Sequence, residues 1–200
     1  IDLEEISGQT QGVIKKIKDR DNYIIRRSVN LSKQTHIIAA NIDQVFLMVT
    51  LNNPPTFTTF IDRFLVTAEA YHVKAVLLFN KIDIYNEDEL LEIKFLAKLY
   101  RDIGYECIGI SAKSGKNVDK VKEMMLGKTS MFSGHSGTGK STLINALEPS
   151  LNLKTLEISE QHKQGQHTTT FAEMFDLSFD ARIIDTPGIK GFGVVDIEKE

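Results

Sequence analysis

The stretch Gly134-His135-Ser136-Gly137-Thr138-Gly139-Lys140-Ser141 decides the fold of this 200-residue chain. An apolar, strand-like run at residues 129–132 precedes it, and a helical pattern begins at residue 140. Glycines at this spacing let backbone N–H groups converge on phosphate oxygens, and the positive end of the following helix adds to the attraction. Chance seldom produces this pattern, because Gly is only about 7% of average composition. The stretch therefore predicts a loop that binds the phosphates of a nucleotide.

Three side chains at the end of this loop have expected roles of their own. Lys140 is expected to reach the β- and γ-phosphates, where it would act as a catalytic residue. The Ser141 hydroxyl is expected to ligate Mg²⁺, with Thr142 near the α-phosphate. The residues expected to bind the phosphates are Gly134, His135, Ser136, Gly137, Thr138, Gly139, Lys140, Ser141 and Thr142.

A second motif, Asn-Lys-Ile-Asp at residues 80–83, follows the strand-like run at residues 76–79 and suits a guanine base. The Asp83 carboxylate can accept two hydrogen bonds, from N1–H and from the 2-amino group, and adenine offers no such pair of donors. The Lys81 stem is expected to lie over the ring, while Asn80 ties the loop together. A third loop, expected to offer a backbone N–H to guanine O6, consists of Ser111, Ala112 and Lys113.

The motif Asp-Thr-Pro-Gly at residues 185–188 follows another strand-like run and is typical of a loop that senses the γ-phosphate. Asp185 is expected to bind Mg²⁺ through water, and the Gly188 N–H to meet the γ-phosphate. A threonine in the polar segment at residues 165–170 should complete the Mg²⁺ ligands. We favour Thr169 over Thr168 for this role.

Ile189 stands where many GTPases carry a glutamine that orients the attacking water. Since Ile189 cannot form a hydrogen bond, another group must position the water. His167, beside the threonine expected to bind Mg²⁺, is the candidate catalytic residue; the competing interpretation is an exposed loop histidine with no catalytic part.

The order of these motifs is unusual, because the base-reading motif precedes the phosphate loop, which precedes residues 185–188. Ordinary small GTPases begin with the phosphate loop, so the order indicates a circularly permuted GTPase domain. From residue 37 onward, strand and helix patterns alternate, which predicts an α/β fold with a mostly parallel sheet covered by helices on both faces. Residues 171–179 and 181–185 are expected to form an antiparallel pair at one edge.

The N-terminal segment carries a local positive charge. Residues 12–18 and 23–28 are strand candidates, and the turn-forming cluster at residues 19–22 between them predicts a hairpin. Between residues 12 and 33 there are seven Lys and Arg and two Asp, and seven minus two gives +5. Such a strand pair could follow a nucleic-acid backbone, although a solvated hairpin face is the alternative. Two strands cannot form a stable domain, so the segment either docks on the rest or is the remnant of a small β-barrel. Ile1, which is not an initiator Met, favours the remnant.

Composition sets the class of protein. Apolar residues are 42% of the chain and charged residues 26%, with a net charge of −3. No apolar run approaches the roughly 18 residues of a membrane span, and no leader opens the sequence, so a cytoplasmic protein without a membrane partner is expected. The single Cys107 excludes an internal disulfide and is expected to be buried. The histidines and Cys107 show no spacing typical of zinc ligands.

The residues resemble the RsgA family, also called YjeQ, which are circularly permuted GTPases dependent on the small ribosomal subunit. The resemblance covers nearly the whole chain and is carried by residues 12–27, 40–45, 80–83, 111–113, 134–145, 167–170 and 185–193. It implies an oligonucleotide-binding-type barrel before the GTPase domain, of which residues 1–36 would be the partial remnant, followed by a GTPase domain at residues 37–200. It also implies a zinc-binding module after the GTPase domain, which this chain does not contain.

The resemblance further implies GTP or GDP and Mg²⁺ as ligands, and binding of a monomer to the 30S subunit and its 16S rRNA. The implied function is late maturation of the 30S subunit, with hydrolysis stimulated by the subunit. The permuted order alone also fits GTPases that act on the large subunit. A GTP-gated rRNA clamp with negligible turnover is a further alternative, whereas Asn80 and Asp83 disfavour an ATP-dependent small-molecule kinase.

Overall fold

The computed structural model describes residues 2–5, 12–27, 35–153 and 173–185. Its main sheet has six strands in the order β7-β6-β5-β8-β10-β9. Their bounds are β5 Gln44–Val49, β6 Lys74–Phe79, β7 Glu106–Gly109, β8 Thr129–Ser133, β9 Glu173–Leu177 and β10 Ala181–Asp185. Neighbouring strands from β7 to β10 run parallel, while β9 pairs antiparallel with β10. The predicted parallel sheet with one antiparallel edge is confirmed.

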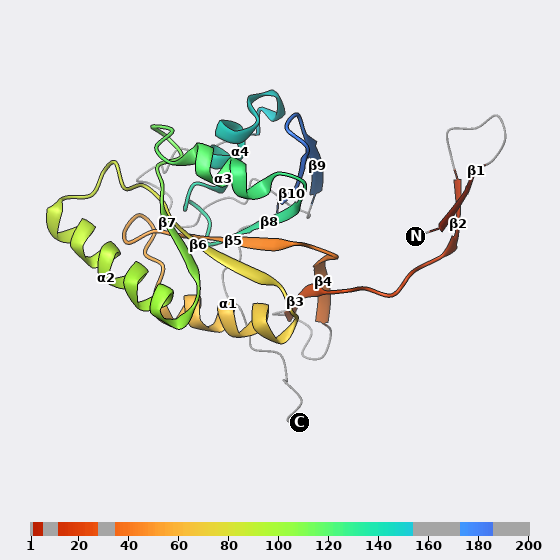
Figure 1. Cartoon of the computed structure of the whole chain (residues 1–200), viewed down its shortest axis with the longest axis horizontal. Coiled ribbons are helices and arrows are strands. Elements are labelled where there is room, and N and C mark those ends of the chain that lie inside the picture. The colour runs from red at the N-terminus through yellow and green to blue at the C-terminus, as the bar shows by residue number, and fades with distance from the viewer. Residues whose placement is uncertain (1, 6–11, 28–34, 154–172, 186–200) are drawn as a thin grey trace.

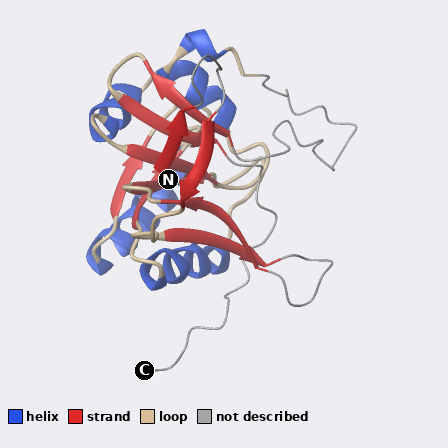
Figure 2. Cartoon of the chain, turned by 90° about the vertical axis from the view of Figure 1, so that its right-hand side faces the viewer, coloured by secondary structure: helices blue, strands red, loops and turns tan. Residues whose placement is uncertain are grey.

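Two helices cover each face of this sheet (Figures 1 and 2). One face carries α1 (Thr58–Ala70) and α2 (Glu87–Ile103), and the other carries α3 (Val118–Met125) and α4 (Lys140–Leu147), which is followed by the short 3₁₀ helix η1 (Pro149–Leu151). This arrangement confirms the predicted fold class. No helix in the described part of the chain is both long enough and apolar enough to pass through a membrane.

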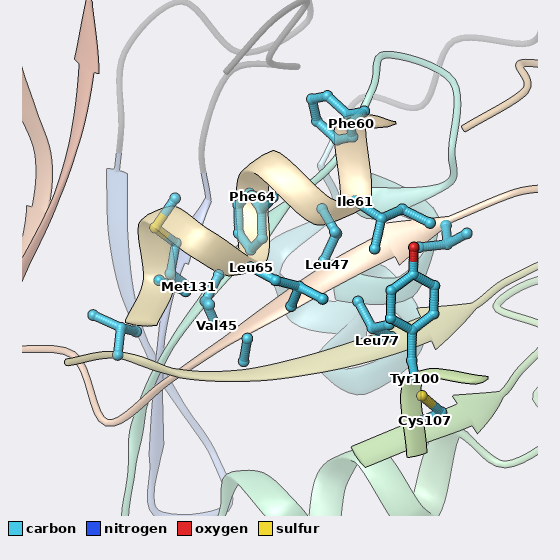
Figure 3. Close-up of a cluster of buried hydrophobic side chains, with 14 of the residues drawn as sticks. Val45, Leu47, Phe60, Ile61, Phe64, Leu65, Leu77, Tyr100, Cys107 and Met131 are labelled. Atoms are coloured by element: carbon cyan, nitrogen blue, oxygen red, sulfur yellow. The ribbon is translucent and has the colours of Figure 1, made fainter. Parts of the chain in front are cut away.

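The central strand β5 is buried along its whole length. Val45 and Leu47 pack under α1, where Figure 3 shows them beneath Ile61 and Phe64, whereas Phe46 packs on the opposite face. A strand covered on both faces has no polar alternation, which is why residues 45–49 of β5 are a continuous apolar run after Gln44.

Local signals set the ends of α2. Asn86 and Glu89 form a reciprocal capping box, in which each side chain accepts from the other residue's backbone N–H at 2.9 Å. Gly104 ends the helix with φ +116°, a left-handed conformation that favours glycine. Both ends of α2 are therefore set by residues next to them in the sequence.

Cys107 lies in β7 and is 5% exposed. Burial raises the pKa of its thiol to about 11, and the nearby Arg101 guanidinium only partly opposes this effect. A thiol with so high a pKa is protonated at neutral pH and is a poor nucleophile. The prediction of a buried, packed cysteine is confirmed.

The hairpin predicted between residues 12–18 and 23–28 is wrong. β2 (Gly12–Lys16) pairs with β1 (Asp2–Glu5), and β3 (Tyr23–Arg27) pairs with β4 (Thr35–Ala40), both antiparallel. Asn22, one of the residues expected to form the turn, bonds to the segment before β5 instead. Its side chain donates to the Ile42 carbonyl at 2.8 Å and accepts from the Ile42 N–H at 2.9 Å. These bonds anchor the chain just before β5 instead of reversing it onto β2.

The two small strand pairs differ in their relation to the main sheet. Ile24 of β3 is fully buried in the core beneath α1, and the Tyr23 ring lies 4.7 Å from the ring of Tyr71. The β1–β2 pair instead lies apart from the sheet (Figure 1). β4 spans both sides of the domain boundary expected between residues 36 and 37.

Glu148 ties the end of α4 to the β9–β10 turn, and this contact makes stability depend on pH. Its carboxylate accepts from the Ser150 hydroxyl at 2.6 Å and from the Ser178 N–H at 2.8 Å. These hydrogen bonds lower the pKa of Glu148 from 4.5 to about 2. A lowered folded-state pKa stabilises the fold above the unfolded-state pKa, and this contribution disappears as pH falls from about 4.5 towards 2.

We expect Glu148→Gln to lower the free energy of unfolding at pH 7, with a difference from the wild type that shrinks as pH falls below about 4. Urea unfolding at several pH values measures this difference. Glu92→Gln, on the exposed face of α2, is the matched control and should change little. A Glu148→Gln penalty that is constant with pH would contradict this account.

Candidate nucleotide-binding site

The predicted binding motifs meet at one edge of the main sheet. Residues 80–83 follow β6, residues 111–113 follow β7, residues 134–139 follow β8, and Asp185 ends β10. Because these strands are parallel, their carboxyl ends lie at the same edge, which is where open α/β sheets bind ligands.

The phosphate loop, residues 134–139, runs from β8 to α4 and is packed too tightly for side chains at two of its glycines. Gly134 has φ +140°, and a Cβ there would lie 2.8 Å from the carbonyl oxygen of Met48. Gly139 has φ +98°, and a Cβ there would collide with Nδ2 of Asn80. Backbone geometry therefore requires both glycines, independently of any ligand.

The donors of this loop fit a polyphosphate. Within the described part of the chain, the backbone N–H groups of Gly137 and Gly139 donate to no protein acceptor. The first turn of α4, with Ser141 and Thr142 half-buried in it, adds further N–H groups that have no partner inside the helix. These donors suit phosphate oxygens.

Lys140 is the most buried cation of the site, at 8% exposure. Its Nζ donates to the carbonyl oxygens of Gly134 at 2.8 Å and His135 at 2.9 Å. Burial lowers the pKa of Lys140 to about 8, and attraction to the Asp185 carboxylate opposes the decrease. A desolvated ammonium favours a nearby anion, so this position fits a bound phosphate group.

Asp185 lies at the end of β10, opposite Phe132 of β8, and is 3% exposed. Its position beside the phosphate loop fits an indirect role in binding Mg²⁺. The other residues predicted for this part of the site, His167, Thr168, Thr169, Gly188 and Ile189, lie outside the described residues.

Asn80 connects three loops through one buried side chain. Its Nδ2 donates to the Thr138 carbonyl oxygen at 2.8 Å, and its Oδ1 accepts from the Ala112 N–H at 3.0 Å. The side chain is 2% exposed, so both hydrogen bonds are shielded from water. The base-reading loop, the phosphate loop and the loop at residues 111–113 are thus held together without a ligand.

Lys81 reaches from the base-reading loop to two other loops. Its Nζ donates to the Gly137 carbonyl oxygen at 2.9 Å and to the Asn53 carbonyl oxygen. Burial lowers its pKa, and the nearby Asp83 carboxylate acts in the opposite direction. Asp83 itself is exposed, and its carboxylate accepts no hydrogen bond within the described part of the chain.

The loop after β7 has its own internal support. The Ser111 hydroxyl accepts from the Ser114 N–H at 3.0 Å, and the Ser111 N–H donates to the Lys116 carbonyl oxygen at 3.0 Å. The Ala112 N–H is already bound to Asn80. Within the described residues, the Lys113 N–H donates to no protein acceptor.

Phe60 and Asn53 shape the site although they lie outside every motif, and the side-chain contacts of His135 and Thr138 were not expected from the sequence. The Thr138 hydroxyl donates to the His135 carbonyl oxygen at 2.8 Å, and the Phe60 ring of α1 lies 4.1 Å from the His135 ring. Asn53, in the loop between β5 and α1, supplies a carbonyl to Lys81. The phosphate-loop motif does not specify the residue type at positions 135 and 138, so the motif could not predict these contacts.

The described residues contain no group of three or more His, Cys, Asp and Glu side chains able to hold a metal ion. A Mg²⁺ bound by Ser and Thr hydroxyls, phosphate oxygens and water does not need such a group.

Comparison with known proteins identifies similar chains over the same fold and motifs. The family model described as RsgA GTPase matches residues 17–195. The small ribosomal subunit biogenesis GTPase RsgA of Christiangramia forsetii is 78% identical over the whole chain, which covers 63% of that protein. The protein of the same name from Flavobacterium johnsoniae is 68% identical over 98% of this chain and 61% of its own length. The chain thus spans about three fifths of the length of these relatives.

Two solved structures share the fold. The crystal structure of YjeQ from Thermotoga maritima superposes with a TM-score of 0.69 at 37% identity, covering 88% of this chain and 55% of that one. YloQ, described as a circularly permuted GTPase, superposes with a TM-score of 0.67 at 26% identity, covering 96% of this chain and 56% of that one. The permuted order inferred from the motifs agrees with these neighbours.

Proposed function

Because this chain belongs to the RsgA GTPase family, we propose that it binds and hydrolyses GTP in the late maturation of the 30S ribosomal subunit, and that the subunit stimulates hydrolysis. The observation that carries the proposal is the side chain of Asn80, which joins the base-reading loop to the phosphate loop and to the loop at residues 111–113. These hydrogen bonds hold the loop expected to read the base next to the loop expected to bind the phosphates, which supports binding of one nucleoside triphosphate.

In this proposal, the base pocket selects guanine. Asp83 accepts from N1–H and the 2-amino group, the Lys81 stem covers the ring, and the Lys113 N–H donates to O6. Asn80 holds the pocket together but leaves the base contacts to its neighbours. The exposed, unbonded carboxylate of Asp83 supports this assignment.

The phosphate side of the site supplies charge and donors. The N–H groups of residues 134–142 bind the α- and β-phosphates, and Lys140 neutralises charge that develops on the β- and γ-phosphates. Ser141 and Thr169 would hold Mg²⁺ directly and Asp185 through water, and Gly188 would donate its N–H to the γ-phosphate. Bound Mg²⁺ would neutralise the phosphate oxygens during transfer to water.

The partner in this proposal is the 30S subunit with its 16S rRNA, bound by a monomer in the cytoplasm. Lys15, Lys16, Lys18 and Arg20 are exposed around the end of β2 and support a contact with the RNA backbone. Residues 1–36 would then be the partial barrel of the family. In the full-length protein, we also expect the zinc-binding module after residue 200.

The test is GTP hydrolysis by the full-length protein in the presence of purified 30S subunits, 50S subunits or naked 16S rRNA, with ATP as competitor. Stimulation by 30S alone, without competition by ATP, is expected. Stimulation by 50S would instead support a factor for the large subunit.

Ile189 favours one second candidate, a GTP-gated rRNA clamp that hydrolyses too slowly for turnover to matter, because it removes the usual water-orienting group. Tight GTP-dependent binding to 30S subunits without stimulated turnover would identify this function.

We expect His167→Ala to abolish most subunit-stimulated hydrolysis, by about 10²–10⁴-fold, because a general base positioned at the attacking water typically contributes that much. An imidazole can accept a hydrogen bond from water at pH 7. GTP and 30S binding should persist, because neither the phosphate loop nor the base pocket is altered. Stimulated rates and binding constants are both measured.

His162→Ala, five residues earlier in the sequence, is the matched control. A His167→Ala variant that hydrolyses normally would remove His167 from the reaction. Loss of subunit binding would show instead that residues 165–170 are a docking element.

A further inference from the structure

A segment outside every nucleotide-binding motif touches both halves of the site. We call residues 51–60, which run from the end of β5 through the first turn of α1, the β5–α1 segment. Its Asn53 carbonyl accepts from Lys81 of the base-reading loop, and its Phe60 ring lies 4.1 Å from the His135 ring of the phosphate loop. Both contacts are made by the protein alone.

His135 contacts the β5–α1 segment through its ring and supports the phosphate loop through its backbone carbonyl. Its carbonyl oxygen accepts from the Lys140 ammonium at 2.9 Å and from the Thr138 hydroxyl at 2.8 Å. Its ring is tilted 35° against Phe60, which is 9% exposed and belongs to the core beneath α1. One residue thus joins the ring contact with α1 to the carbonyl that both donors share, so packing of the ring restrains the backbone of residue 135.

The β5–α1 segment is itself held in place, so it can act as a support. The Thr50 hydroxyl donates to the Pro54 carbonyl oxygen at 2.6 Å, and the Thr56 N–H donates to the Thr50 carbonyl oxygen at 2.8 Å. The Leu51 N–H donates to the Tyr85 hydroxyl at 3.0 Å, which links the segment to the residues just before α2. Phe60 therefore presents a fixed surface to His135.

We propose that Phe60 and His135 are positioning residues for the nucleotide, whose ring contact holds the phosphate loop in its binding conformation before the nucleotide arrives. The inference rests on the proposed binding of GTP and adds a determinant of nucleotide residence time. A loop that is ordered in advance does not lose conformational freedom on binding. Weakening the contact therefore accelerates nucleotide release more than it slows hydrolysis of bound GTP.

The test measures release of a fluorescent GDP analogue from the full-length protein without ribosomes. An aromatic pair contributes about 0.5–1.5 kcal/mol beyond its burial, so His135→Ala is expected to accelerate release about two- to ten-fold. His135→Phe keeps a planar ring against Phe60 and should restore slow release. In the stimulated reaction, His135→Ala should raise KM by more than it lowers kcat.

Phe60→Leu supplies the second arm, since it removes the ring but keeps an apolar side chain in the core. Its effect on release and that of His135→Ala should be less than additive in the double variant, because both remove the same contact. Phe95→Leu, at an exposed aromatic of α2, is the matched control and should release the analogue at the wild-type rate.

Wild-type release by His135→Ala would overturn the inference, as would fully additive effects of the two substitutions. A lower kcat of His135→Ala with an unchanged release rate would also overturn the inference, because His135 would then act in hydrolysis itself. If Phe60→Leu is unstable in thermal unfolding, the comparison of His135→Ala with His135→Phe decides alone. A wild-type protein that binds no guanine nucleotide would refute the proposed function. If the wild type binds normally and His135→Ala releases the analogue at the wild-type rate, only this inference is refuted.

Discussion

Replacing Lys140 with alanine is expected to lower GTP hydrolysis on the order of 10²–10³-fold, the usual cost of removing one group that stabilises transition-state charge. Lys140 is 8% exposed, and its ammonium donates to the carbonyls of Gly134 and His135 within the phosphate loop, so alanine removes a charge held inside the site. Single-turnover hydrolysis at saturating GTP, with 30S subunits present, measures the loss.

Lys120→Ala is the matched control, because Lys120 is an exposed lysine on α3 and belongs to none of the predicted nucleotide-binding motifs. Circular dichroism and thermal unfolding should show that the Lys140→Ala variant keeps its fold. Wild-type turnover in a folded Lys140→Ala variant would place the active site elsewhere.

Replacing Asp83 with asparagine is expected to weaken GTP binding by about 10²–10⁴-fold, since two hydrogen bonds to a charged acceptor are lost at about 1.5–3 kcal/mol each. Affinity for xanthosine triphosphate should rise at the same time, because its C2 carbonyl can accept from the new amide. The Asp83 carboxylate is exposed and accepts no hydrogen bond in the described part of the chain, so the substitution breaks no protein contact of that kind.

Competition between the two nucleotides, in parallel titrations of the wild type and the variant, measures this exchange of specificity. Asp88→Asn, an exposed carboxylate in the first turn of α2, is the control and should keep the wild-type preference. If Asp83→Asn binds GTP with unchanged affinity, residues 80–83 do not read the base.

The sequence determined the elements whose signals are local. Helix α2 begins and ends where Asn86 and Gly104 indicate, because a capping box and a left-handed glycine depend only on neighbouring residues. The phosphate loop and the base-reading loop were located by residue types that phosphate and guanine demand at a given spacing. The alternation of strands and helices then restricted the main sheet to a mostly parallel arrangement, since crossover connections permit little else.

Only the tertiary structure decided which strands pair and which side chains support the site. β2 pairs with β1 and not with β3, and Asn22 bonds to Ile42, a contact across 20 residues that no local pattern encodes. The contact between Phe60 and His135 is also set by packing, since it brings α1 against a loop 75 residues later in the chain. The chemistry of a ligand determines which residue types can touch it, so such residues can be found from the sequence. A residue that acts through its neighbours is determined by the shape of the folded core. That shape exists only once distant segments have come together.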